Sequence, residues 1–87
     1  MYVILVYDIG ENRVGKMLKL CRKYLNWIQN SVFEGELSES QFKRLKHDAL
    51  LIIDPEVDSI ILFLSKTDHY MDKQIIGIEK SELTQFL

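Results

Sequence analysis

The chain has 87 residues, 47% of them hydrophobic and 28% charged, with a formal net charge of −2 at pH 7. This length favours a single domain, and this composition excludes a disordered chain. The slightly negative charge excludes a general electrostatic attraction to nucleic acid, so any such binding must come from local clusters of basic residues.

The first predicted element is a buried strand over residues 2 to 8, YVILVYD, because this short run is almost entirely apolar and rich in Val, Ile and Tyr. The run is too short to cross a membrane, and it lacks the basic residues that begin a signal peptide. No membrane partner is therefore expected.

A helix is predicted over residues 13 to 25, where apolar residues recur at spacings of three and four. The apolar stripe includes Cys21, the single cysteine, which is expected to be buried. One cysteine forms no intramolecular disulfide, and this usage fits a reducing, cytoplasmic compartment. The remaining arc of the helix carries basic residues and no acidic residue: Arg13, Lys16, Lys19, Arg22 and Lys23.

Residues 27 to 37, WIQNSVFEGEL, are predicted to be extended, and the sequence leaves open whether they form one long bent strand or two short strands. Ser38 follows, with Gln41 three residues later, a capping-box pattern that predicts the start of a second helix. The pair Asp54 and Pro55 predicts the end of that helix.

The last third of the chain is predicted to hold a central strand over residues 58 to 66, a connection over residues 67 to 74 and a short final strand over residues 75 to 80. The order of elements predicts one α+β domain over residues 1–87: a ferredoxin-like βαββαβ sandwich with an extra C-terminal strand, both helices lying on one face of a mostly antiparallel sheet. The extra strand is expected either to complete its own sheet or to pair at the interface of a homodimer.

Asp8 is the first candidate functional residue, because it ends a central strand at the rim of the sheet, where ligands often bind in such folds. Mg²⁺ prefers oxygen ligands, and a two-fold axis would add the same carboxylate from a second chain. The structural alternative is that Asp8 caps the following turn or pairs with Arg13. The residues alone leave both interpretations open.

The basic arc of the first helix is the second candidate. Lys and Arg side chains supply most of the salt-dependent affinity for nucleic acid, and Tyr7 and Tyr24 are possible stacking groups for bases. The alternative is a solvated helix face, which is common in globular proteins. Both interpretations again remain open.

Several motifs together resemble the small CRISPR-associated adaptation proteins of the Cas2 family. That family begins with a strand ending in Tyr-Asp, here Tyr7 and Asp8, followed by a helix with Arg-x-x-Lys-type residues, here from Arg13. It continues with Q-x-S-V-F-E-G, here residues 29 to 35. The similarity covers nearly the whole chain. One departure is Trp27, where many members carry a basic residue.

The resemblance implies a homodimer in which the last strand joins the partner's sheet and the two Asp8 side chains share a Mg²⁺ or Mn²⁺ ion. It implies metal-dependent endonuclease activity on single-stranded RNA or double-stranded DNA, with Asp8 and Tyr7 as catalytic residues and Asp8 as the metal ligand. The nucleic-acid contacts that the resemblance implies are Arg13, Ser31 and Phe33, and the basic arc of the first helix adds Lys16, Lys19 and Lys23 as expected contacts with phosphate.

The resemblance also implies a protein partner, the CRISPR-associated integrase, whose dimers this homodimer would bridge during spacer integration. The endonuclease would itself take part in this integration. The alternative within the family is a non-catalytic dimeric scaffold that bridges integrase dimers on spacer DNA, with Asp8 as a structural residue. The alternative outside the family is a ferredoxin-like module that senses a small ligand. Replacing Asp8 separates the nuclease from the scaffold, and binding of a nucleic-acid duplex separates both from the sensor.

Overall fold

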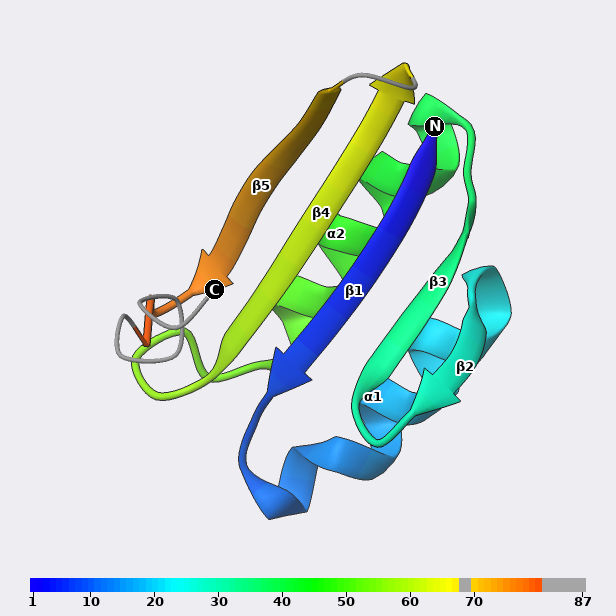
Figure 1. Ribbon diagram of the computed structural model, residues 1–87. Coiled ribbons are helices and arrows are strands. Elements are labelled where there is room, and N and C mark those ends of the chain that lie inside the picture. Colours follow the sequence, from blue (N-terminus) through cyan, green and yellow to red (C-terminus); the bar gives the residue numbers. More distant parts are fainter. Residues whose placement is uncertain (68–69, 81–87) are drawn as a thin grey trace.

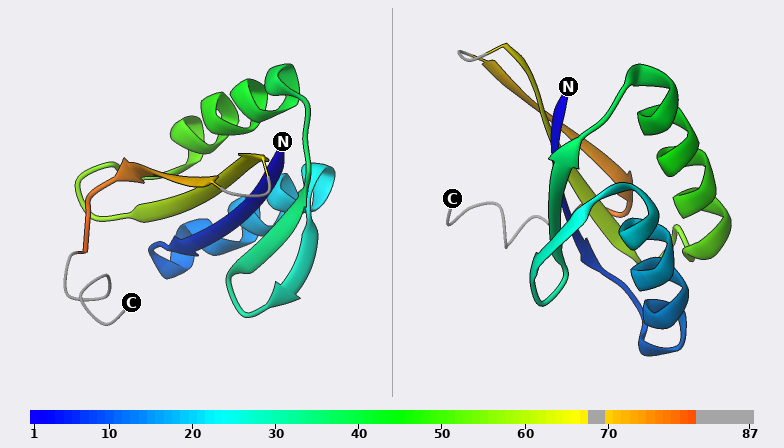
Figure 2. Two further views of the ribbon diagram at one scale, coloured as in Figure 1. Left: turned by 45° about the horizontal axis from the view of Figure 1, so that its top comes forward. Right: turned by 90° about the vertical axis from the view of Figure 1, so that its right-hand side faces the viewer.

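The computed structural model, which describes residues 1–67 and 70–80, has a five-stranded antiparallel sheet with two helices on one face (Figures 1 and 2). The strand order β2-β3-β1-β4-β5 is ferredoxin-like for the first four strands, with β5 added beside β4, so the predicted fold class is confirmed. The elements are β1 (Tyr2–Asp8), α1 (Glu11–Tyr24), β2 (Asn26–Gln29), β3 (Val32–Glu36), α2 (Glu39–Ile52), β4 (Ser59–Thr67) and β5 (Tyr70–Gly77).

The central strand β1 pairs with β3 on one side and with β4 on the other, and its residues alternate between two environments. Val3, Leu5 and Tyr7 face the helices and are buried. The intervening residues face the opposite side of the sheet, and Asp8 is the last of them. We call this side the open face, because among the described residues no helix covers it (Figure 2).

The open face carries a band of partly buried apolar side chains across three neighbouring strands. Cross-strand pairing aligns Val6 with Val32 and Ile61, and Ile4 with Phe63. Each of these side chains keeps an intermediate exposure. A contiguous apolar band of this kind is typical of a surface that another protein covers.

The two helices follow the predicted patterns closely. Ser38 and Gln41 form the capping box: the Ser38 hydroxyl accepts from the Gln41 N–H at 3.1 Å, and the Ser38 N–H donates to Gln41 Oε1 at 2.9 Å. On α1 the predicted burial of Cys21 is confirmed, since none of its surface is exposed. Among the described residues, neither helix is long and apolar enough to cross a membrane.

Residues 27 to 37 form two short strands rather than one bent strand. The turn between β2 and β3 places Asn30 at φ 45°, a left-handed conformation that Asn tolerates better than most residues. The indole N–H of Trp27 donates to the Asn30 carbonyl oxygen at 2.9 Å and fixes the turn.

The predicted boundaries of the last strand are wrong. Residues 67 to 74 were expected to be a connection, yet β5 begins at Tyr70 and pairs with β4 in an antiparallel hairpin. The strand ends at Gly77, not at residue 80, because Gly77 adopts φ +89° and the chain bends there. The pairing of this strand with the sheet of a partner stays a prediction.

Candidate functional site

Asp8 lies at the end of β1 on the open face, and its side chain is 59% exposed. Its register partner on β4 is Ser59. The carboxylate pairs with Lys80, whose Nζ lies 3.0 Å from Asp8 Oδ2. The same ammonium group donates to the Asp8 carbonyl oxygen at 3.4 Å. The structure therefore presents Asp8 to solvent, as expected of a ligand-binding carboxylate, and gives it a basic neighbour that the sequence did not reveal.

Asp58 is a neighbour of this site that the sequence did not indicate. Its side chain is 1% exposed and accepts from Arg13 Nε at 2.5 Å and from Arg13 Nη2 at 2.9 Å. It also accepts from the backbone N–H groups of Gly10 and Asp54, each at 2.8 Å. Asp58 therefore joins the loop after β1, which begins next to Asp8, to the loop between α2 and β4.

These contacts control the charge of Asp58. The hydrogen bond from the Arg13 guanidinium, supported by the N–H groups of Asp54 and Gly10, holds the Asp58 pKa well below its usual range, although burial acts in the opposite direction. Arg13 therefore forms an ion pair with Asp58, and its Nη1 donates to Asn12 Oδ1 at 3.1 Å. The alternative that Arg13 pairs with Asp8 is wrong, and its contact with phosphate stays a prediction.

Tyr7 and Phe33 belong to the core, not to the surface beside Asp8. Tyr7 is 7% exposed and Phe33 is 0% exposed, and their rings stack with centroids 6.1 Å apart. Burial raises the pKa of Tyr7, so its hydroxyl stays protonated. The predicted direct contact between Phe33 and nucleic acid would require a side chain that is fully buried in this fold to become exposed. Tyr7 faces the helices, whereas Asp8 faces the other side of the sheet.

Ser31 lies in the turn between β2 and β3 and is partly buried. Its carbonyl oxygen accepts from the Tyr7 N–H at 3.1 Å, so this turn sits beside the C-terminal end of β1. Of the predicted contact residues, Ser31 is thus brought near the end of the strand that carries Asp8.

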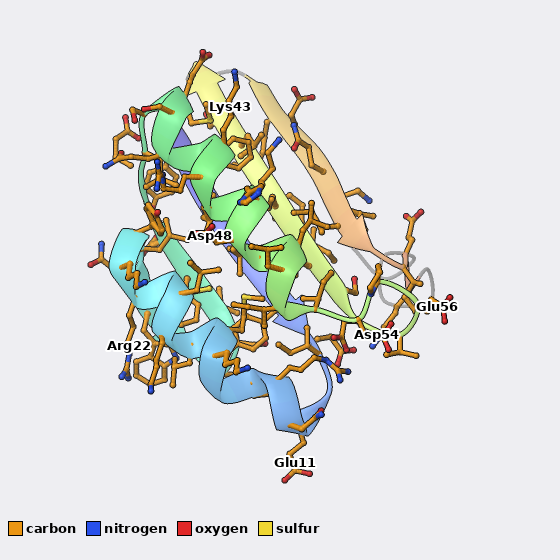
Figure 3. All side chains as sticks on the ribbon, turned by 180° about the vertical axis from the view of Figure 1, so that it is seen from behind. Glu11, Arg22, Lys43, Asp48, Asp54 and Glu56 are labelled. Carbon is orange, nitrogen blue, oxygen red and sulfur yellow. The ribbon has the colours of Figure 1, made fainter. Side chains whose placement is uncertain are left out.

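The predicted phosphate-binding lysines lie on the helix layer. Lys16, Lys19 and Lys23 line an open groove of about 400 Å³ between α1 and α2, together with Leu20 and three residues of α2: Asp48, Leu51 and Ile52. Figure 3 shows the two helices side by side in front of the sheet, with Arg22 on the side of α1 away from α2. The structure brings these three lysines together with one another, but not with Asp8.

The described residues of one chain supply an incomplete metal site. No group of three or more His, Cys, Asp or Glu side chains converges within residues 1–67 and 70–80. Asp8 offers an exposed carboxylate at the end of the central strand, of the hard-oxygen type that Mg²⁺ or Mn²⁺ prefers. The donor set therefore fits a divalent cation only if a second Asp8 is added by another copy of the chain.

The fold and this site define a class: small ferredoxin-like α+β proteins with a lone carboxylate at the end of the central strand. Within that class, the chain belongs to the family described as CRISPR associated protein Cas2, whose model matches residues 1–73. The resemblance in the motifs is thus confirmed.

Relatives match the chain over nearly all or all of its length. A protein from Dictyoglomus turgidum, named CRISPR-associated endoribonuclease Cas2, is 49% identical over 87 residues and covers 100% of both chains. A protein of the same name from Thermotoga maritima is 45% identical over 82 residues, which is 94% of each chain. These names describe the relatives.

Solved structures of the family share the fold. A crystal structure of Cas2 superposes with a TM-score of 0.74 at 42% identity, covering 93% of this chain and 91% of the other. Streptococcus pyogenes Cas2, crystallised at pH 6.5, superposes with a TM-score of 0.71 at 34% identity, covering 78% of this chain and 89% of the other. The order of strands and helices is therefore a family property.

Proposed function

We propose that this chain is a metal-dependent endonuclease of the CRISPR adaptation system that cleaves single-stranded RNA. The relatives' name, CRISPR-associated endoribonuclease Cas2, supports RNA as the substrate. The observation that supports this proposal most directly is the position of Asp8. It is an exposed carboxylate at the end of the central strand, on a sheet face that carries an apolar band next to it. Double-stranded DNA is the second substrate to test.

The active form is a homodimer in which two open faces pack together. The apolar band of Ile4, Val6, Val32, Ile61 and Phe63 would be buried by such packing, which favours association of two short chains. Asp8 lies at the edge of this band, so a two-fold axis near it would bring the two carboxylates together.

The two Asp8 carboxylates would hold Mg²⁺ or Mn²⁺ between them. The bound cation supplies the chemistry of polarising a phosphoryl oxygen or activating a water molecule. The ion pair between Asp58 and Arg13 would contribute by holding the loop that follows Asp8 in place, since Asp58 also accepts from the Gly10 N–H of that loop. Tyr7 supports the same strand from the core side through its stacking on Phe33.

Lys16, Lys19 and Lys23 contribute phosphate contacts away from the cleavage centre. Because these lysines lie on the helix layer, the proposed binding of phosphate is at a different place from the proposed cleavage at Asp8. This separation also favours a second candidate function, in which the dimer bridges dimers of the CRISPR-associated integrase on spacer DNA without cutting it. In that case the lysines remain necessary and Asp8 does not. The family match leaves the ligand-sensing alternative without a supporting observation.

The test is cleavage of labelled single-stranded RNA and of duplex DNA by the wild type and by Asp8→Asn, with Mg²⁺ and with chelator. The nuclease proposal expects cutting by the wild type with metal, and a loss of about a hundredfold or more in Asp8→Asn, as for removal of a group that acts on the transition state. Equal cutting by both proteins would reject Asp8 as the catalytic ligand. Binding of duplex without cutting by either protein would favour the scaffold.

A further inference from the structure

The Asp8 carboxylate has a cationic partner from the far end of the chain. Lys80 is 29% exposed, and its ammonium group contacts both the carboxylate and the carbonyl oxygen of Asp8. The family model ends at residue 73, so Lys80 lies outside the segment that the family match covers.

A bend at Gly77 brings Lys80 to Asp8. Because β1 and β5 both run antiparallel to β4, their C-terminal ends lie at the same end of the sheet (Figure 1). Gly77 then takes φ +89°, and the Ile78 N–H donates to the Asp58 carbonyl oxygen at 2.9 Å. A Cβ on Gly77 would lie 2.1 Å from that oxygen, so the bend requires glycine. The approach of Lys80 to Asp8 is thus set by the backbone.

The other predicted phosphate-binding cations are held elsewhere. Arg13 is engaged by buried Asp58, and the three lysines of α1 line the groove between the helices. Within the described part of the chain, Lys80 is the basic side chain placed against the Asp8 carboxylate. A phosphate that approached a cation on Asp8 would therefore meet Lys80 first.

We propose that Lys80 is a phosphate-binding residue of the Asp8 site, held on Asp8 in the free protein and released to a substrate phosphate when a divalent cation takes the carboxylate. This inference rests on the proposed role of Asp8 as metal ligand. An ammonium group and a divalent cation compete for the same carboxylate because each neutralises the same charge. The ion pair is exposed, so breaking it costs little. The bend at Gly77 keeps the released ammonium group within the site, where a phosphate oxygen is a strong acceptor.

The test compares Lys80→Gln with the wild type in two measurements. Without RNA, the Mn²⁺ concentration at half-saturation, followed by the paramagnetic resonance of free Mn²⁺, is expected to fall about two- to fivefold, because Asp8 has lost its competitor. At saturating Mn²⁺, the KM for single-stranded RNA is expected to rise about two- to tenfold with a smaller change in kcat, because a charged phosphate contact is lost. The two constants move in opposite directions, which a purely structural role of Lys80 would not produce.

Two variants serve as controls. Lys73→Gln removes the same charge from an exposed lysine on β5, whose Nζ lies 4.0 Å from Glu79, and should leave the Mn²⁺ half-saturation unchanged. Lys80→Arg keeps the charge and should restore the wild-type KM.

The inference is overturned if Lys80→Gln weakens both Mn²⁺ and RNA binding, or changes neither. Asp8→Asn distinguishes a failure of the proposed role of Lys80 from a failure of the proposed metal-binding role of Asp8. If it abolishes Mn²⁺ binding while Lys80→Gln has no effect, the role of Lys80 alone is rejected. If Asp8→Asn binds Mn²⁺ with the same affinity as the wild type, both the proposed metal-binding role of Asp8 and the proposed role of Lys80 are rejected.

Discussion

Tyr7 and Asp8 are neighbours in the sequence but belong to opposite layers of the molecule. The period of two along a strand sends Tyr7 into the core and Asp8 to the open face. In the proposed endonuclease, Tyr7 would therefore act only through the position of β1, whereas Asp8 is exposed where a metal ion or a substrate could contact it.

Asp58 should make the stability of the protein depend on pH in a defined direction. Its folded-state pKa is held below the unfolded value by the Arg13 hydrogen bond, so the contribution of the ion pair is complete at neutral pH and is lost as the pH falls. At pH 7, Asp58→Asn is expected to lower the free energy of unfolding by about 2 kcal/mol. That difference from the wild type should shrink below about pH 4, where the carboxyl group of the unfolded chain protonates.

Urea unfolding at several pH values measures this difference. Unfolding free energies of the two proteins that decline in parallel between neutral and acidic pH would contradict the assignment of Asp58 as the acid-sensitive group. Asp58 could not have been identified from the sequence, because its partner Arg13 lies 45 residues away and only the fold brings them together. Arg13 accordingly looked like a free cation of the basic arc.

At the scale of elements, two glycines offer a matched test of the backbone. Gly77→Ala should lower the free energy of unfolding by about 1 to 3 kcal/mol, because the residue has φ +89° and the new Cβ would meet the Asp58 carbonyl oxygen. Gly15→Ala should raise it by about 0.5 to 1 kcal/mol, because Gly15 is inside α1 and a Cβ there meets nothing within 4 Å. Thermal and urea unfolding of both variants measure the sign of each change in the free energy of unfolding. A neutral or stabilising effect of Gly77→Ala would show that the bend does not need glycine.

The elements that the sequence predicted well are those with strong local signals. The capping box at Ser38 correctly predicted the start of α2, and the apolar run correctly predicted the bounds of β1. The beginning of β5 was missed because Met71, Asp72 and Lys73 are exposed on an edge strand, so no apolar alternation marks them. Its end was missed because the bend at Gly77 depends on a contact with Asp58, which is distant in sequence.

At the scale of the whole molecule, the two sides of the sheet carry different candidate features. The helix layer carries the basic groove between α1 and α2, and the open face carries the apolar band and Asp8. The site residues predicted from the sequence therefore fall into separate groups. Only the three-dimensional arrangement could separate them, because in the sequence Asp8 and the lysines of α1 lie within sixteen residues of one another.

The open face is expected to be the dimer interface. Phe63→Glu places a charge in the apolar band and should raise the dissociation constant of the dimer by about tenfold or more, because a desolvated carboxylate in an interface is costly. Leu51→Glu is the control, since Leu51 is 75% exposed on α2 and outside the band. Sedimentation equilibrium of both variants decides the matter. Equal dissociation constants for Phe63→Glu and the wild type would place the interface elsewhere.

The central claim is that two chains complete one metal site through their Asp8 carboxylates. The most direct measurement is the stoichiometry of Mn²⁺ bound to the dimer, by titration calorimetry or by paramagnetic resonance, for the wild type and for Asp8→Asn. The account predicts one Mn²⁺ ion for every two chains in the wild type and loss of that site in Asp8→Asn. One ion per chain, or binding that survives the substitution, would contradict it.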